Sequence, residues 1–375
     1  MTTLYIDSKK VSALYVDGKK VQLGAQEPQY LTFEPLGSAA NLTRITLRNS
    51  GSWSFTGTFE AKLNDGAWTT VSWEDVSNGI DYNLVTACDA SRETISFGEK
   101  LQIRGLDKWN GNCSLKVTCA GGAKVYGKLA DSFTPELAAS TASNKFEGFF
   151  KDSTGLKDAS GLDLGDIAIT SHCYDSMFRS CTSLTQAPAL PATTLAEGCY
   201  HYMFYGCTSL TQAPALPATS LAKNCYDGIF WNCRSLTQAP ALPATTLAEN
   251  CYIRMFNNCS SLTQAPALPA TALAKGCYDG MFFGCSSLTQ APALPATALA
   301  DSCYNYMFYS CTNLTHAPAL PATSLAQGCY TNMFSYCTNI TELHYPASIE
   351  NDSTFTGMYG TPWFGANNAT VYYDL

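Results

Sequence analysis

The sequence repeats cysteine with a period of 26 residues, and this period constrains the fold more than any other feature. Cysteines stand at positions 173, 199, 225, 251, 277, 303 and 329, and a second cysteine follows each of them eight residues later, ending at Cys337. Between them the phrase L-T-Q-A-P-A-L-P-A-T-x-L-A recurs with few changes. A unit this short cannot bury its own apolar face, so we expect the copies to stack on one another as a solenoid.

Each unit predicts two kinds of local structure. The segment from Leu210 to Pro217 contains two prolines, which lack an N–H and favour extended backbone, so it predicts a short strand. The following residues Leu221, Cys225, Ile229 and Cys233 are spaced by four, which indicates a helix of about two to three turns. A strand plus a short helix in 20 to 29 residues is typical of a leucine-rich-repeat turn.

The repeats resemble a known family. The string M-F-Y-G-C-T-S-L-T from Met203 to Thr211, followed by A-P-A-L-P, resembles the BspA-like leucine-rich repeat, and the resemblance extends over residues 149–345. The variety with Pro-Ala-Leu-Pro and C-Y-x-x-M-F is similar to repeat proteins of gut bacteria and their phages. The resemblance implies a solenoid and a role in surface adhesion. Ala-Pro stands where the family prefers β-branched residues, so we expect short or irregular strands.

The N-terminal part predicts two further units. Residues 1–26 duplicate a short motif at Leu4–Val11 and Leu14–Val21 and predict tandem β-hairpins, which either dock to a partner by adding strands or pack on their own chain. Residues 27–130 show short alternating apolar runs, separated by turn residues such as Asn64-Asp65-Gly66, and predict a small antiparallel β-sandwich.

The two ends of the repeat array predict caps. Residues 131–172 are interpreted as a linker and a degenerate capping repeat, with Ser153 in the cysteine slot and a charged surface toward solvent. The solenoid spans 173–345. Residues 346–375 predict a C-terminal cap in which the aromatic segments 361–365 and 370–373 cover the last turn. The expected fold class is mainly β with short helices: hairpins and a β-sandwich, then a leucine-rich-repeat solenoid of 26-residue turns.

The cysteines are interpreted as buried free thiols. Neighbouring turns lie about 4.8 Å apart, so disulfides between turns are geometrically conceivable, but seven turns cannot be paired evenly. Free cysteine behaves as a small buried hydrophobe, and a cytoplasmic folding compartment keeps it reduced. A bridge between Cys113 and Cys119 is left open. We expect no metal and no cofactor, because there is no C-x-x-C, and His172, His201, His316 and His344 have no carboxylate at a recurrent spacing.

Three classes of function are disfavoured by the sequence. No common catalytic motif occurs, and Asp175, Asp227 and Asp279 are interpreted as exposed residues at helix starts, so we expect no enzyme. Nucleic acid is disfavoured because residues 161–375 hold five Lys or Arg against 12 Asp or Glu. No apolar stretch is long enough to span a membrane, and residues 1–7 do not start a signal peptide, although a leader removed earlier would leave the same start.

A binding function is expected instead, at positions beside the repeated M-F. Variable aromatic residues there predict a ladder suited to sugar rings or a surface polymer, since exposed aromatics are enriched at binding surfaces: Tyr202, Tyr205, Trp231, Phe283, Tyr306, Tyr309 and Tyr336. The alternative is that they only cover the repeat edges. A second stripe, Gln186, Gln212, Gln238, Gln264, Gln290 and His316, predicts a hydrogen-bonded structural ladder or, less simply, a periodic ligand site.

Three functions remain open at this stage, all non-enzymatic. The first is a phage virion protein, folded in the host cytoplasm, whose N-terminal region docks to other virion proteins and whose solenoid binds a host cell-surface protein or glycan. The second is a bacterial BspA-like cell-surface adhesin. The third is a structural decoration without a ligand. The oligomeric state is left open, with a homo-oligomer among the options.

Overall fold

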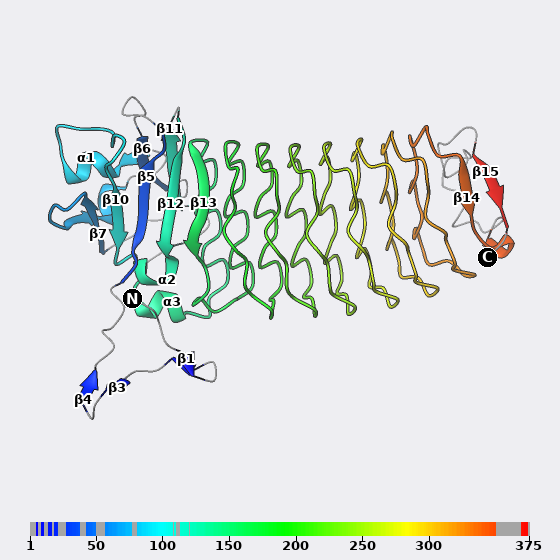
Figure 1. The fold of residues 1–375 in the computed structure, drawn as a ribbon, viewed down its shortest axis with the longest axis horizontal. Helices are drawn as coiled ribbons and strands as arrows, with labels where there is room; N and C mark the ends of the chain where they lie inside the picture. Colours follow the sequence, from blue (N-terminus) through cyan, green and yellow to red (C-terminus); the bar gives the residue numbers. More distant parts are fainter. Residues whose placement is uncertain are drawn as a thin grey trace.

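The computed structural model describes residues 5–6, 9–10, 14–16, 19–21, 28–37, 43–49, 57–76, 81–107, 109, 113–119, 121–349 and 369–373. Sheets gather at the N-terminal end, and a long row of stacked turns runs from them to the C-terminal end (Figure 1). Among the described residues the helices are few and short, and none lies within 173–345. The mainly β class is confirmed, and the stacked repeats fit a solenoid.

Two small hairpins open the described part of the chain. Strand β1 (Tyr5–Ile6) pairs antiparallel with β2 (Lys9–Lys10), and β3 (Leu14–Val16) pairs antiparallel with β4 (Lys19–Val21). Each pair forms a two-stranded sheet that includes no other described strand. The hairpins therefore lie where the duplicated motif places them.

Residues 31–163 contribute a six-stranded and a three-stranded sheet. The first has the order β13-β12-β5-β10-β7-β8, and the second the order β11-β6-β9. All neighbours are antiparallel except β12 and β13. The bounds of the first sheet are β5 Leu31–Pro35, β7 Thr58–Leu63, β8 Thr69–Ser72, β10 Leu101–Arg104, β12 Ala123–Lys128 and β13 Leu156–Asp163. Those of the second are β6 Thr43–Asn49, β9 Asp81–Asn83 and β11 Cys113–Cys119.

Alternate residues are buried in β10, β11 and β12, as the period of two in a strand predicts. In β11, Cys113, Leu115 and Val117 point to the core, so Cys113 and Cys119 stand at opposite ends of one extended strand. That strand is about 20 Å long, so the suggested bridge between them is wrong.

Short helices connect the strands. They are α1 Leu84–Cys88, α2 Leu129–Ser132 and α3 Pro135–Ala139, with 3₁₀ turns at Trp73–Asp75 and Ala347–Ile349. Helix α1 begins where the Asn83 side chain accepts the Val85 N–H (3.0 Å), a standard N-cap. It contacts β6 of one sheet and β7 of the other. That residues 27–130 form a sandwich stays a prediction.

The expected helix within each repeat is wrong. In its place lies a ribbon of successive turns in which alternate N–H groups have different acceptors. The His201 N–H donates to the Gly198 carbonyl within the turn (3.1 Å), whereas the Tyr202 N–H donates to the Asp227 carbonyl of the next repeat (2.9 Å). Every fourth residue has a positive φ: 59° at Gly198, 51° at Tyr202 and 71° at Gly206.

The reason lies in backbone hydrogen bonding between repeats. A helix uses its N–H groups within one segment, so it has none left for a neighbouring turn. The ribbon gives every second N–H to the next repeat and so joins the turns along the whole array. Its period of four also keeps Cys225, Ile229 and Cys233 on the buried face, which a spacing of four in the sequence cannot distinguish from a helix.

The expected strand in A-P-A-L-P is reduced to single bridges. Parallel bridges join Gln212 to Gln238 and Gln238 to Gln264, just before the prolines of each unit. Two prolines per unit remove the N–H groups that would extend the ladder.

The core of the array is built from columns of identical side chains. Tyr200 stacks on Tyr226 with ring centroids 5.9 Å apart, and Phe204 stacks on Phe230 at 5.8 Å, with nearly parallel rings in both pairs. The Cys233 thiol donates to the Phe204 carbonyl of the preceding turn (3.1 Å), and this contact recurs along the array. All fourteen repeat cysteines are buried free thiols, so the predicted burial is confirmed. Burial raises the pKa of the Cys199 thiol to about 12.

The first turn does not face solvent, which corrects the expectation for the capping repeat. The Leu115 N–H of β11 donates to the Phe149 carbonyl (2.7 Å), so backbone bonds continue from the N-terminal region into the array. Ser153 occupies the cysteine slot and is fully buried. Its hydroxyl accepts the Val117 N–H (3.1 Å) and donates to the Leu115 carbonyl (2.8 Å), two bonds that a thiol would form poorly.

The last turn is covered by a parallel strand pair. Strand β14 (Glu342–His344) pairs with β15 (Thr370–Tyr372), and the rings of His344 and Tyr372 stack at 4.8 Å. This agrees with the expected aromatic cover at 370–373. The other predicted segment, 361–365, lies outside the described residues.

Candidate functional site

Three columns of variable side chains run along one edge of the array. We call the residues that directly follow the buried Phe the post-Phe column: Arg179, Tyr205, Trp231, Asn257, Phe283, Tyr309 and Ser335. The left-handed column, in which every φ is positive, contains Ser176, Tyr202, Gly228, Arg254, Gly280, Tyr306 and Asn332. The carboxylate column contains Asp175, His201, Asp227, Ile253, Asp279, Asn305 and Thr331. Because all three follow the 26-residue period, residues from successive repeats become neighbours.

The predicted aromatic ladder is present but divided in two. Tyr202, Tyr205 and Trp231 form the first cluster, with ring centroids 5.4 to 5.8 Å apart. In the second, Phe283 stacks on Tyr309 at 4.5 Å, Tyr309 meets Tyr336 at 5.0 Å, and Tyr306 lies 5.5 Å from Tyr309. Six of the seven predicted residues are half-buried, and Tyr336 is 60% exposed.

Asn257 causes the division. It occupies the post-Phe column between Trp231 and Phe283, where its short side chain leaves space that an aromatic ring would fill. Gly280 in the neighbouring column widens this space. The result is a pocket of about 400 Å³ lined by Trp231, Arg254, Asn257, Asn258, Asp279, Gly280, Phe283 and Tyr306. Its volume falls within the range of small-molecule sites.

Several polar side chains line this pocket. Asn257 is only 6% exposed and lines the pocket. The indole N–H of Trp231 is buried and has no hydrogen-bond partner within the described residues. The guanidinium of Arg254 lies 5.4 Å from the Trp231 ring. Burial raises the pKa of Asp279, which accepts a hydrogen bond from Asn305 (3.1 Å). Apolar walls with a few convergent polar groups are typical of ligand pockets.

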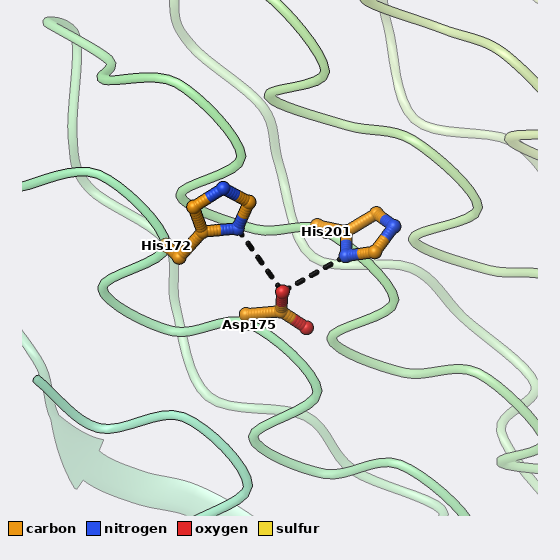
Figure 2. Close-up of side chains that lie close together, drawn as sticks. All are labelled: His172, Asp175 and His201. Carbon is orange, nitrogen blue, oxygen red and sulfur yellow. Dashed lines mark hydrogen bonds and ion pairs between the residues drawn. The ribbon is translucent and has the colours of Figure 1, made fainter. Parts of the chain in front are cut away.

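A second cluster was missed in the sequence. His172 Nδ1 lies 3.1 Å from Asp175 Oδ2, and His201 Nδ1 lies 2.9 Å from the same oxygen (Figure 2). The interpretation that the histidines lack carboxylate partners is therefore wrong for these two. Asp175, Asp227 and Asp279 are also not exposed helix-start residues, because no helix lies within 173–345 and none of the three is exposed. The side chains of Asp175 and Asp227 are 14% and 16% exposed.

The electrostatics of this cluster follow from its burial. Burial alone would lower the pKa of His201. Hydrogen bonds to Asp175 and Asp227 outweigh this effect and raise the pKa above its ordinary value, to about 9. Burial alone would raise the pKa of Asp175, yet the His201 contact holds it below its ordinary value. The sequence does contain a signal for this cluster. Asp175 follows His172 by three residues and precedes His201 by one period of 26, so the two histidines are 29 residues apart.

The glutamine stripe is aligned as expected but is not an amide ladder. Backbone bridges place Gln212, Gln238 and Gln264 in register, and all of them are exposed. Within the described part of the chain no hydrogen bond joins one glutamine side chain to another. The adjacent threonines make the link, since the Thr237 hydroxyl donates to the Thr211 carbonyl (3.4 Å).

Comparison with known proteins gives one match. Residues 171–295 and 225–357 match the family described as BspA type Leucine rich repeat region, in 6 copies. No curated protein and no solved structure shows a significant match to the chain. A search of the described residues finds no helix with the length and hydropathy of a membrane span.

Proposed function

Because residues 171–357 of this chain belong to the BspA-type leucine-rich-repeat family, we propose that it is a non-enzymatic surface adhesin whose solenoid edge binds a carbohydrate. Repeat regions of this family are typically scaffolds that bind other molecules. The observation that carries the carbohydrate proposal is the pocket at Asn257, between the two aromatic clusters.

The walls of the pocket suit a sugar ring. Trp231 and Phe283 both line the pocket and stand two turns apart, about 10 Å at the usual spacing between turns. A flat apolar ring face packs well against the C–H face of a sugar. The two aromatic clusters extend this surface beyond the pocket, so several residues of a longer chain have somewhere to lie.

The floor of the pocket suits hydroxyl groups. Asn257 offers two N–H donors and a carbonyl acceptor, and Arg254 and Asp279 add donors and acceptors on either side. A ligand hydroxyl would pair with these groups as it displaces water from them, whereas a purely apolar ligand would displace the water without replacing its hydrogen bonds.

The cellular setting is part of the proposal. The BspA-like family fits a bacterial cell surface, and no structural observation favours a virion over it. The tandem hairpins at 5–21 present strand edges that suit strand addition to a partner, so we assign attachment to the N-terminal region and ligand binding to the solenoid. Immunoelectron microscopy with an antibody against residues 161–375 tests the setting: labelling of cell envelopes supports it, and labelling confined to phage particles contradicts it.

The carbohydrate proposal is tested with an array of defined oligosaccharides, followed by calorimetry on those that bind. We expect the variant Asn257→Trp to lose at least tenfold in affinity, because the indole would fill the gap between Trp231 and Phe283. The matched control is Ser335→Trp, which adds the same side chain to the same column outside the pocket and should leave affinity unchanged for a monosaccharide, which is small enough to occupy the pocket alone.

Two results would contradict the proposal. One is a set of sugars bound equally well by the Asn257→Trp variant, which would place binding elsewhere. The other is no saturable binding to any glycan on the array while a cell-surface protein binds the intact chain. Circular dichroism of both variants confirms that the comparison is between folded proteins.

A further inference from the structure

We propose that His172, Asp175 and His201 form a binding site for a divalent transition-metal ion at the start of the solenoid. The site lies in the first two full repeats, away from the aromatic pocket, and is independent of the carbohydrate proposal. Three side chains from two successive turns converge there on one point (Figure 2).

The geometry already approaches that of a metal site. Each of the three residues offers one donor atom, and these three atoms lie within 4.8 Å of one another. The Nδ1 atoms of His172 and His201 lie 3.1 and 2.9 Å from Asp175 Oδ2. In a tetrahedral site with metal–donor bonds of about 2.0–2.2 Å, donors lie about 3.3–3.6 Å apart. The two distances from Asp175 Oδ2 would therefore change by a few tenths of an ångström to admit the ion, and the two histidine rings would move toward the positions that a tetrahedral site requires.

The surroundings hold these ligands in place. His201 uses Nδ1 toward the site, and its other ring nitrogen, Nε2, lies 3.5 Å from Asp227 Oδ2. A carboxylate behind a histidine in this way fixes the ring orientation and raises ligand basicity, as in many zinc sites. The His172 ring lies over Gly198, where an added Cβ would come within 2.4 Å of the ring, so the glycine leaves room for the imidazole.

The charge of the cluster also favours a cation. Asp175 and Asp227 are both largely buried, and their recorded ion pairs within the described residues are with histidines. Asp227 Oδ1 is buried without a hydrogen-bond partner within the described residues. Two largely buried carboxylates therefore flank the imidazole of His201. A divalent ion would offset this excess of negative charge.

The donor set defines the class of ion. Two imidazole nitrogens and one carboxylate suit zinc, cobalt, nickel or copper, whereas calcium and magnesium require more oxygen ligands. Three protein ligands leave one tetrahedral position for water or a ligand group. Further along the carboxylate column Asp279 faces Asn305 instead of a histidine, so we expect one site per chain.

The test is a titration of the full reduced chain with cobalt(II), followed by visible absorption, and with zinc(II), followed by calorimetry. We expect one ion per chain and the visible bands of tetrahedral cobalt without an intense thiolate charge-transfer band, because the repeat cysteines are buried. Zinc should raise the unfolding temperature, since it binds the folded state.

Matched variants decide the assignment. His201→Gln and Asp175→Asn should each weaken binding at least tenfold, while His316→Gln and Asp279→Asn should leave it unchanged. The proposal is overturned by absence of saturable binding, by a thiolate band that accounts for the bound cobalt, or by equal binding in all four variants. Unfolding temperatures measured without metal separate loss of the site from loss of the fold.

Discussion

Replacing Gly206 with alanine and Ser310 with glycine tests the turn ribbon through the sign of the stability change. Both residues occupy the same position in the repeat and have positive φ values, 71° at Gly206 and 57° at Ser310. If the segment were helical, as its spacing of four suggests, Gly→Ala would stabilise it by about 1 kcal/mol and Ser→Gly would destabilise it. The ribbon predicts the opposite signs.

The magnitude follows from the local geometry. A Cβ at Gly206 would find its nearest neighbour, the Ser180 Cα, at 3.8 Å, which is ordinary contact, so no steric clash adds to the effect. A left-handed conformation costs a non-glycine residue about 1–2 kcal/mol. Alanine recovers about 0.4–1 kcal/mol by restricting the unfolded chain. We therefore expect Gly206→Ala to destabilise by about 1 kcal/mol and Ser310→Gly to stabilise by a similar amount.

Urea unfolding followed by fluorescence measures the global effect, and a change of 1 kcal/mol corresponds to a midpoint shift on the order of 0.3 M. Hydrogen exchange measures the local one, because the Gly206 N–H donates to the Trp231 carbonyl of the next repeat (2.8 Å) and exchanges when that contact opens. Exchange near residue 206 should accelerate in Gly206→Ala and remain unchanged around residue 310. A higher midpoint for Gly206→Ala together with a lower one for Ser310→Gly would refute the ribbon.

Three further predictions concern the thiols, the junction and acid stability. In the native protein only the half-buried Cys88 and Cys119 should react promptly with Ellman's reagent, and all 17 thiols should react in denaturant; prompt native labelling of the repeat cysteines would contradict their burial. Ser153→Ala leaves the Val117 N–H and the Leu115 carbonyl unpaired, so it should lower the free energy of unfolding by about 2–5 kcal/mol. Proteolysis between the N-terminal region and the array should then be faster, and an unchanged rate would show that Ser153 does not hold this junction. A hydrogen bond from Arg92 lowers the pKa of Glu99 from 4.5 to about 2, so its contribution to stability is present above pH 4.5 and lost as the pH falls toward 2; a Glu99→Gln variant should show a shallower acid transition in a pH series of thermal melts.

The stacking of the repeats could be predicted from the sequence because it depends only on the 26-residue period. Any feature that recurs every 26 residues must form a column when the units stack, whatever the local backbone does. The buried columns of Cys, Tyr and Phe, such as Tyr200 on Tyr226, follow from this argument. The alignment of the exposed glutamines follows from it too.

The local backbone was not readable, because two structures share its pattern. Cys225, Ile229 and Cys233 fall on one face in a helix and also in a ribbon with a period of four. What distinguishes them is φ at every fourth residue, and the sequence carries only a weak signal for it: glycine and asparagine recur there, as at Asn224 and Gly228, but so do Tyr202 and Arg254. Bonds to the next turn outweigh the local preferences of these residues.

Only part of the candidate sites could be predicted from the sequence. Aromatic side chains can be recognised as candidate binding residues in the sequence alone. Asn257 indicates a pocket only when it is compared with the longer side chains at the same position of the neighbouring repeats. The histidine cluster required two distances to be combined, the period of 26 and the turn of three, which place His172 and His201 on either side of Asp175. A search for fixed motif spacings cannot find such a pair.

The alternation of backbone donors has a consequence for the length of the molecule. Every turn accepts from the one before it and donates to the one after it through the same backbone positions, so any two turns of the array present interchangeable faces. Removing or copying one unit of 26 residues leaves both junctions intact and changes the reach by about 5 Å. Gain or loss of a whole unit would therefore change the length of the solenoid in fixed steps while the chemistry of each remaining turn is preserved.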